Sequence, residues 1–236
     1  LLSLVQSAGM ALGLFVALAA DGIGLRRSLL AGLTTLGVAG LLGGFANSAA
    51  ALLALRALEG FGLLLAATPA PSLIRRLVAA RRLDAMLGLW GAYMPIGTAG
   101  ALLAGPWLIH TIGWQGWWWA VSALSLAVAL WVRQAVPPDG AAASSAPEPW
   151  TARLRRTLSS SGPWLMALSF AMYSGQWLAV IGFLPSIYAQ AGLQGGMVGL
   201  LTALAAAVNI VGNVSAGRLL QRGVPPQALL YCGFAV

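Results

Sequence analysis

The sequence predicts an all-α integral membrane protein. Hydrophobic residues make up 59% of the 236 positions, charged residues make up 8%, and the mean hydropathy is +0.85, which is far from the composition of a soluble domain. Apolar runs of about 20 residues, the length of a helix that crosses a bilayer, recur along the chain. The two-residue alternation of a membrane barrel strand is absent from the sequence, so these runs predict spanning helices.

Seven complete spanning helices are predicted, and an eighth begins near residue 227. Each run ends where charges or a cluster of Gly, Asn, Ser and Pro interrupts it. In order, the predicted helices are residues 1–20, 28–46, 50–71, 85–109, 117–136, 164–188 and 197–217. The interruptions that end them are, in order, the acid and arginines of 21–27, the polar residues of 47–49, the arginines of 75–82, the link 110–116, the Pro- and Ser-rich segment 137–163, the link 189–196 and Arg218.

The arginines predict the orientation of these helices. All thirteen basic residues are arginine, and all except Arg56 fall in every second connection. Arginine-rich connections stay on the cytoplasmic side of a membrane, so the links 47–49, 110–116 and 189–196 are expected to face outward. The sequence therefore predicts a multi-pass protein of the cell inner membrane. The cytoplasmic arginines are Arg26, Arg27, Arg75, Arg76, Arg81, Arg82, Arg133, Arg153, Arg155, Arg156, Arg218 and Arg222.

This orientation places residue 1 outside, without a Met or a basic leader, and predicts a fragment that lacks an odd number of upstream helices. Pro, Ser, Ala and charges replace the apolar pattern between the fifth and sixth helices. The domains expected are therefore an N-terminal bundle over 1–136, a cytoplasmic linker over 137–163 and the start of a C-terminal bundle over 164–236. The sequence at the end of the seventh helix is similar to that at the end of the first. A repeat with an offset of six helices indicates two six-helix halves.

Two motifs carry a resemblance to a known family. LALRALEGFG at 53–62 has Leu, Arg and two Gly in the pattern of the fourth helix of the major facilitator superfamily, with Glu59 where that family has Gln. The stretch LAADGIGLRR at 18–27 is similar to the family's loop after its second helix. The resemblance implies a bundle of two six-helix halves, here incomplete and running from the family's second helix to its ninth. The style of GWQGWWW and QWLAVIGFLPSIYAQAG is loosely similar to the branch of cyanate and nitroimidazole transporters.

Arg56 and Glu59 are the first candidates for a transport pathway. An uncompensated arginine inside a bilayer costs from about 3 to more than 10 kcal/mol. One interpretation is local, because Glu59 is three residues further on the same helix face and neutralises the charge. The other places Arg56 in a central cavity, as the resemblance implies, where it holds an anion or a coupling carboxylate. Glu59 is then the candidate proton carrier, or else a structural partner of Arg56.

Polar side chains on later helices are the remaining pathway candidates. Tyr173, Gln176 and Trp177 share one face of the sixth helix and either line the cavity or pack between helices. Asn209 and Asn213 form a similar stripe on the seventh helix, for which interhelical hydrogen bonding competes with cavity lining. Tyr93, beside a proline of the fourth predicted helix, is the weakest candidate.

Two loops are expected to gate the pathway. The resemblance implies this role for the first, which holds Asp21, Gly24, Arg26 and Arg27, and Asp21 is expected to cap the next helix or to meet a neighbouring one. The related loop after the seventh helix keeps arginines but no acid, so the two are not interchangeable. Its candidate residues are Arg218 and Arg222.

The function predicted is secondary active transport of a small solute by alternating access. The arginine favours an organic or inorganic anion, with or without a coupling proton, and efflux of drugs or metabolites is the alternative. A membrane-embedded enzyme is a remote alternative, because one His and five acids cannot build a usual catalytic set; a channel is another. We expect no cofactor, no metal and no nucleic-acid partner, and a monomer in the lipid bilayer.

Overall fold

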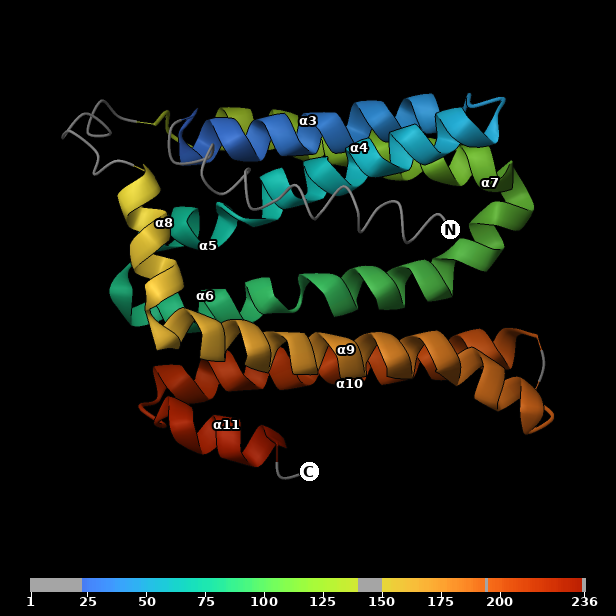
Figure 1. Ribbon diagram of the computed structural model, residues 1–236. Helices are drawn as coiled ribbons and strands as arrows, with labels where there is room; N and C mark the ends of the chain where they lie inside the picture. Colours follow the sequence, from blue (N-terminus) through green and yellow to red (C-terminus); the bar gives the residue numbers. More distant parts are fainter. Residues whose placement is uncertain (1–22, 140–149, 194, 235–236) are drawn as a thin grey trace. The chain divides into compact units, whose positions relative to one another are not determined.

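A computed structural model describes residues 23–139, 150–193 and 195–234, which fold as helices without a strand (Figure 1). The predicted segment 1–20 lies outside the described residues. The helices are α3 (Leu25–Gly43), α4 (Ala49–Ala67), α5 (Ala70–Leu77), α6 (Ala80–Gly91), α7 (Tyr93–Ala135), α8 (Trp150–Ser159), α9 (Ser161–Gln190), α10 (Gly196–Gln221) and α11 (Pro226–Phe234).

Within these ranges, five helical stretches are long and apolar enough to cross a membrane. One of them, Ala80–Ala135, has 56 residues, which at about 1.5 Å per residue is far longer than a single crossing of about 30 Å. The chain turns inside it at Gly113, whose φ of 74° and ψ of 170° are not helical. The protein is thus an all-helical, multi-pass membrane protein. The other four stretches are Leu25–Gly43, Ala49–Leu77, Ser161–Gln190 and Gly196–Gln221.

Several predicted helix boundaries were wrong, and prolines and glycines account for most of the differences. The predicted helix 50–71 stops at Ala67 because Pro69 begins a separate short helix, α5. The predicted helix 85–109 is interrupted at Ala92, since Pro95 has no N–H to donate to the carbonyl four residues earlier. The predicted link 110–116 is helical except at Gly113.

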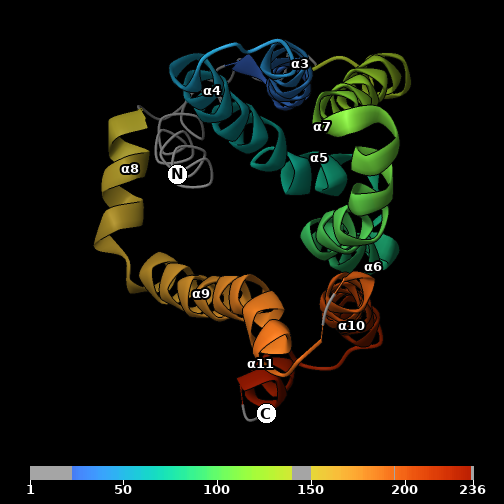
Figure 2. The same cartoon turned by 90° about the vertical axis from the view of Figure 1, so that its right-hand side faces the viewer.

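The described chain divides into two compact units, and the first comprises residues 23–87 and 105–139. In this unit α3 and α4 lie side by side (Figure 2). A Cβ atom on Gly32 would come within 2.4 Å of the Ala66 backbone nitrogen, so only glycine allows this approach. The hydroxyl of Ser28 donates to the Leu65 carbonyl across the same contact, at 3.1 Å.

The C-terminal half of α7 packs on α3 in the first unit. Gly40 faces Ser122, whose hydroxyl oxygen would lie 2.2 Å from a Cβ at that glycine. The Trp119 indole N–H donates to the Leu41 carbonyl at 3.3 Å, and its ring centroid is 4.9 Å from that of Phe45. These contacts fix the rotation of α7, and with it the direction in which Trp118 points.

The second unit comprises residues 88–104, 150–193 and 195–234. Here the end of α6 meets α10 backbone to backbone, because a Cβ on Gly88 would lie 2.7 Å from the Gly217 Cα. Apolar side chains elsewhere on α9 and α10 point outward: Phe170 is 68% exposed and Val208 is 71% exposed. Lipid rather than water is the medium that suits such surfaces.

Candidate functional site

The most polar site within the membrane-spanning part of the first unit is an ion pair on α4. Ser48 caps this helix by accepting a hydrogen bond from the Ala51 N–H at 3.2 Å, which fixes its start. Arg56 and Glu59 follow at a spacing of three residues, and the guanidinium bonds the Glu59 carboxylate directly. The local ion pair between Arg56 and Glu59, which was one of the two interpretations of the sequence, is therefore present.

Trp118 of α7 completes this charged cluster, which consists of Arg56, Glu59 and Trp118. Its indole N–H donates to the second carboxylate oxygen of Glu59 at 3.3 Å. Its ring centroid lies 5.2 Å from the guanidinium carbon of Arg56, within the range of a cation–π contact. Both partners of the ion pair thus contact the same tryptophan, and the side chains of Arg56 and Glu59 are only 20% and 10% exposed.

The charged cluster lines a cavity of about 270 Å³ between α3, α4 and α7. Its wall combines the ion pair with the aromatic face of Trp118 and the hydroxyls of Ser122 and Ser125. Each hydroxyl donates its hydrogen to a backbone carbonyl four residues earlier, at 2.8 and 3.1 Å, so its oxygen keeps acceptor capacity. A cavity of this size suits a small solute, and the site offers it one cation, one titratable anion and neutral acceptors.

A second polar group, the amide cluster, consists of Tyr173, Asn209 and Asn213 in the second unit. The Asn213 amide nitrogen donates to the Asn209 carbonyl at 3.0 Å and to the Asn209 side-chain oxygen at 2.7 Å. The Tyr173 hydroxyl of α9 reaches that same oxygen at 3.3 Å. The interhelical hydrogen bond considered in the sequence analysis is therefore present between α9 and α10. A Cβ on Gly91 of α6 would lie 3.0 Å from the Asn213 side-chain oxygen.

The other pathway candidates in the second unit are Tyr93, Gln176 and Trp177. Tyr93 is the first residue of α7, is 42% exposed and has its ring 5.5 Å from that of Trp90. On α9, Gln176 is exposed and Trp177 is half-buried. Among the described residues, no three His, Cys, Asp or Glu side chains gather to hold a metal ion.

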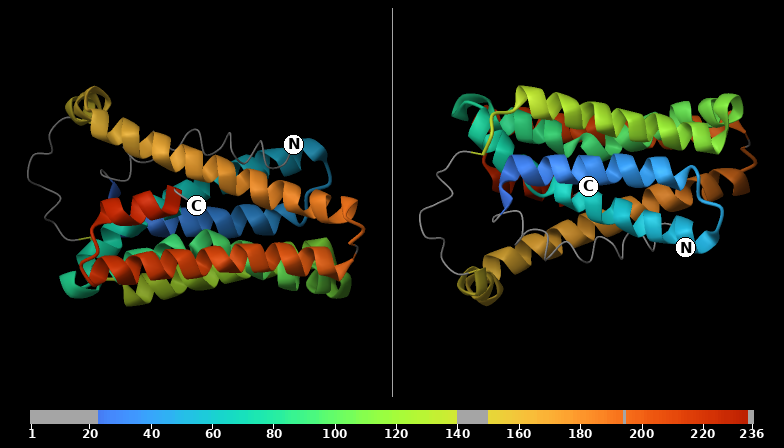
Figure 3. Two further views of the ribbon diagram at one scale, coloured as in Figure 1. Left: turned by 90° about the horizontal axis from the view of Figure 1, so that it is seen from below. Right: turned by 90° about the horizontal axis from the view of Figure 1, so that it is seen from above.

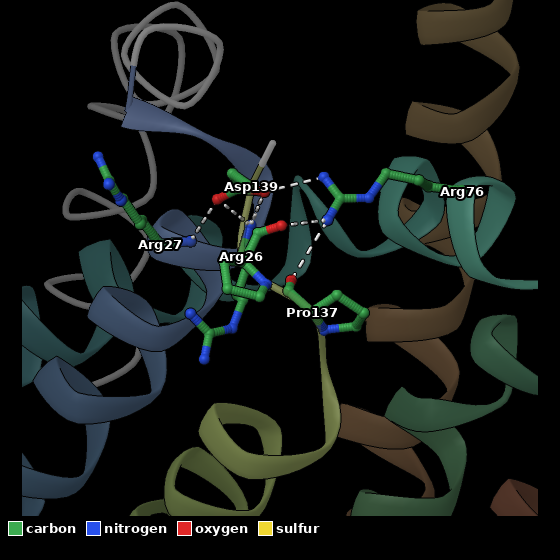
Figure 4. A network of polar contacts seen from close by, with 6 residues as sticks. Arg26, Arg27, Arg76, Pro137 and Asp139 are labelled. Carbon is green, nitrogen blue, oxygen red and sulfur yellow. Dashed lines mark hydrogen bonds and ion pairs between the residues drawn. The ribbon is translucent and has the colours of Figure 1, made fainter. Parts of the chain in front are cut away.

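The start of α3, for which a gating role was expected, is held by an acid that was not among the predicted site residues. Asp139, just after α7, accepts hydrogen bonds from the backbone N–H groups of Arg26 (3.1 and 3.2 Å) and Arg27 (3.1 Å) in the first turn of α3 (Figure 4). Gly24, with φ of 101°, leaves room for this carboxylate, which would lie 2.5 Å from a Cβ there. Asp139 thus occupies the helix-capping role that had been expected of Asp21, which lies outside the described residues.

Arg76 of α5 joins the same network. Its guanidinium bonds Asp139 at 3.0 Å and donates to the carbonyls of Pro137 and Pro138 at 3.3 and 3.2 Å. Burial raises the pKa of Asp139, but the two backbone N–H groups and the Arg76 charge lower it by more, so the pKa lies below its ordinary value. Asp139 therefore joins α3, α5 and the segment after α7 as an ionised carboxylate.

The second loop candidates are exposed at the end of α10. Arg218 lies in its last turn, and Arg222 is its C-cap, whose backbone N–H returns to the Arg218 carbonyl at 3.1 Å. Gly223 follows with φ of 89° and turns the chain toward α11. This is an ordinary helix end, unlike the acid-bridged start of α3.

Sequence reasoning missed Trp118 and Asp139. Trp118 is one of three consecutive tryptophans that the sequence does not distinguish from one another, yet it is half-buried against the ion pair. Its position 59 residues from Glu59 gives no periodic signal. For Asp139 the available signal was that it is one of only five acids, placed beside the arginine-rich connections.

Comparison with known proteins identifies one family. A family model described as Major Facilitator Superfamily matches the chain over residues 1–236. Neither the curated proteins nor the solved structures gave a match.

Proposed function

The chain belongs to the major facilitator superfamily, whose members are secondary transporters of small molecules, and on this premise we propose that its charged cluster binds a small organic or inorganic anion. The observation that carries the proposal is the ion pair between Arg56 and Glu59. Both residues belong to a helix that is long and apolar enough to span a membrane, and both line the same cavity. Ionisable groups at such depth mark substrate or ion pathways far more often than they serve packing.

The two charges support a proton-linked cycle. While Glu59 is ionised, it neutralises Arg56 and competes with any anion for the guanidinium. Protonation of Glu59 removes this competitor, so an anion in the cavity can accept hydrogen bonds from Arg56 in its place. The net charge of the site is the same before and after these two events, which avoids leaving an uncompensated charge in the bilayer.

Trp118 has a positioning role in this proposal. Its indole N–H holds one Glu59 oxygen and its ring supports the guanidinium, so both charges keep their places when the ion pair opens. The oxygens of Ser122 and Ser125 add neutral contacts for the solute. The loose likeness to cyanate and nitroimidazole transporters favours a compact anion among the possible substrates.

We place the protein in a cell inner membrane with its arginine-rich connections in the cytoplasm, as the positive-inside rule favours. In this orientation the network around Asp139 and the linker that follows it face the cytoplasm. The roles of Arg26, Arg27, Arg218 and Arg222 as gates, and of Asp21, rest on the family motif.

Uptake by the full-length protein in proteoliposomes tests the proposal. Cyanate, nitrate and formate serve as small anions, ethidium as a cationic drug, and an internal pH dye reports proton movement. We expect at least one anion to enter faster under an inward proton gradient, and addition of that anion to acidify the lumen. Ethidium movement without anion uptake would overturn the proposal in favour of drug efflux.

Two variants assign the activity to the site. Glu59→Gln keeps an oxygen for the Trp118 N–H but cannot exchange a proton, so anion uptake should lose its dependence on the proton gradient. Trp131→Phe, an exposed position on α7 (69%), is the matched control and should transport normally. Proton-coupled uptake by Glu59→Gln at the rate of the unmodified protein would contradict the assignment.

A further inference from the structure

The helix α8 has no role in the proposed transport site, yet its sequence is strongly two-sided. It follows a Pro- and Ser-rich stretch and carries Arg153, Arg155 and Arg156 without an acid. Leu154 and Leu158 are one helical turn apart and therefore share a face. A short helix with leucines on one side and arginines beside them has the pattern of a helix that lies at a membrane surface.

The junction with α9 gives α8 its direction. Ser160, with φ of −97° and ψ of 137°, is extended and separates the two helices. Figure 1 shows α8 running across the end of α9, and in Figure 3 α8 is seen end-on where α9 is seen lengthwise. Because α9 is long and apolar enough to cross the membrane, a helix perpendicular to its end lies along the membrane surface.

Side-chain hydrogen bonds hold this corner. The Trp164 indole N–H of α9 donates back to the Leu158 carbonyl at 2.9 Å, and the Ser160 hydroxyl donates to the Arg156 carbonyl at 2.7 Å. The Ser159 hydroxyl reaches that same carbonyl at 3.2 Å. The carbonyls of Arg156 and Leu158, near the end of α8, thus have hydrogen-bond partners although the helix does not continue into α9.

A shallow groove of about 550 Å³ runs along the apolar side of α8. Leu154 and Leu158 line it together with Arg155 and the hydroxyl residues Thr151 and Ser159. Leu158 is 53% exposed and Arg155 is also exposed. The groove therefore offers an apolar floor, hydroxyl groups and a cation, which match an acyl chain and an anionic headgroup.

We propose that α8 is an interfacial anchor that binds anionic phospholipid headgroups through Arg155 and Arg156 while Leu154 and Leu158 enter the acyl boundary of the same leaflet. The bilayer is the occupant that continuity favours, because α8 ends one residue before a membrane-spanning helix begins. The charge of α8 selects anionic over zwitterionic lipid. This proposal depends on α9 crossing the membrane and is independent of what the protein transports.

Spin labels on the full-length protein test the anchor. Cys232, the one cysteine of these 236 residues, and every cysteine outside them are first replaced by serine. A label is then attached at Leu158→Cys on the apolar side or at Ala152→Cys, about 120° away around the helix. In nanodiscs of phosphatidylcholine with phosphatidylglycerol, the Leu158 label should collide with oxygen dissolved in lipid, and the Ala152 label with a water-soluble nickel reagent.

The lipid selectivity has its own variant. Without phosphatidylglycerol, or at high salt, the Leu158 label should move toward water. In Arg155→Gln the preference for anionic over zwitterionic lipid should fall about fivefold. This is the change in binding expected when one arginine near an anionic membrane surface is lost. Equal exposure of both labels to water in every lipid would overturn the anchor. Shielding of the Leu158 label from both reagents, in nanodiscs and in detergent alike, would show a protein partner and overturn it too.

Discussion

The charged cluster and the amide cluster solve the same problem, which is to keep polar side chains inside a membrane, in different ways. Asn209 and Asn213 satisfy each other one turn apart, and a single hydroxyl from α9 joins them. Arg56 and Glu59 each carry a full charge, and a tryptophan from another helix contacts both. Burying two hydrogen-bonded neutral amides costs little free energy, whereas burying two charges costs much more even when they are paired. A charge pair without a function would therefore be an expensive way to fill this position. The comparison supports the proposal that the charged cluster takes part in transport, and it leads us to propose a packing role for the amide cluster.

The largest effect is expected from breaking the ion pair on one side. Arg56→Gln leaves the Glu59 carboxylate with the Trp118 N–H but without its counter-charge, which should lower the free energy of unfolding by about 3–5 kcal/mol. Thermal unfolding in detergent, followed by circular dichroism, measures this. An Arg56→Gln protein as stable as the parent would mean that the pair is more weakly coupled than its geometry indicates.

Trp118→Phe should have an intermediate effect. The variant keeps an aromatic ring beside Arg56 but removes the N–H that binds one Glu59 oxygen at 3.3 Å. An unsatisfied buried acceptor costs about 1–3 kcal/mol, and uptake should fall because Glu59 is no longer held in place. The same assays apply, and Trp119→Phe, which removes a bond to a backbone carbonyl rather than to the pair, is the matched comparison. Equal loss of uptake in both variants would remove the special role of Trp118.

Asp139 shows how the same ionic chemistry behaves outside the membrane. Because its pKa is lowered in the folded protein, its ionised form stabilises the fold above the unfolded-state pKa of about 3.9, and this contribution disappears as the pH falls through the lower folded-state pKa. The free energy of unfolding of Asp139→Asn at pH 7 should therefore be about 1 kcal/mol lower than that of the parent, which thermal unfolding in detergent measures. The difference in stability between the parent and Asp139→Asn should shrink in acid. If this difference were the same at about pH 3 as at pH 7, the lowered pKa of Asp139 would be contradicted.

The smallest effect is expected in the amide cluster. Tyr173→Phe removes one hydrogen bond of 3.3 Å between α9 and α10, and such bonds inside membranes contribute about 0.6 kcal/mol on average. The remaining Asn209–Asn213 bonds stay intact, so the melting temperature and anion uptake should barely change. Loss of uptake in stable Tyr173→Phe protein would make the amide cluster part of the pathway and would remove the contrast with the charged cluster.

The sequence predicted the parts of this structure that depend on local pattern. Apolar run length located most of the spanning helices, and the three-residue spacing of Arg56 and Glu59 made their pairing one of the two interpretations considered. The breaks at Ala92 and after Ala67 lie beside Pro95 and Pro69, and the predicted helices ran past them because the apolar pattern continues through both prolines. The helix α8 was hidden by the Pro and Ser residues before it, although the four-residue spacing of its leucines was readable.

The missing parts are those that depend on distant residues meeting. Asp139 is 112 positions from Arg27 and 63 from Arg76, and nothing periodic links them. Trp118 reaches Glu59 only because Gly40 and its neighbours let α7 approach α3 closely. Composition and spacing cannot reveal such tertiary contacts, so the candidate site was predicted as a pair and found as a cluster.

The most direct test of the central claim is anion uptake by the double variant Arg56→Gln/Glu59→Gln. Both charges are removed together, so neither is left alone in the membrane, and the stability lost in Arg56→Gln should largely return. If the ion pair is the transport device, this folded protein takes up no anion above the background of empty proteoliposomes. Uptake at the rate of the unmodified protein would show that the pair is only structural and would contradict the account.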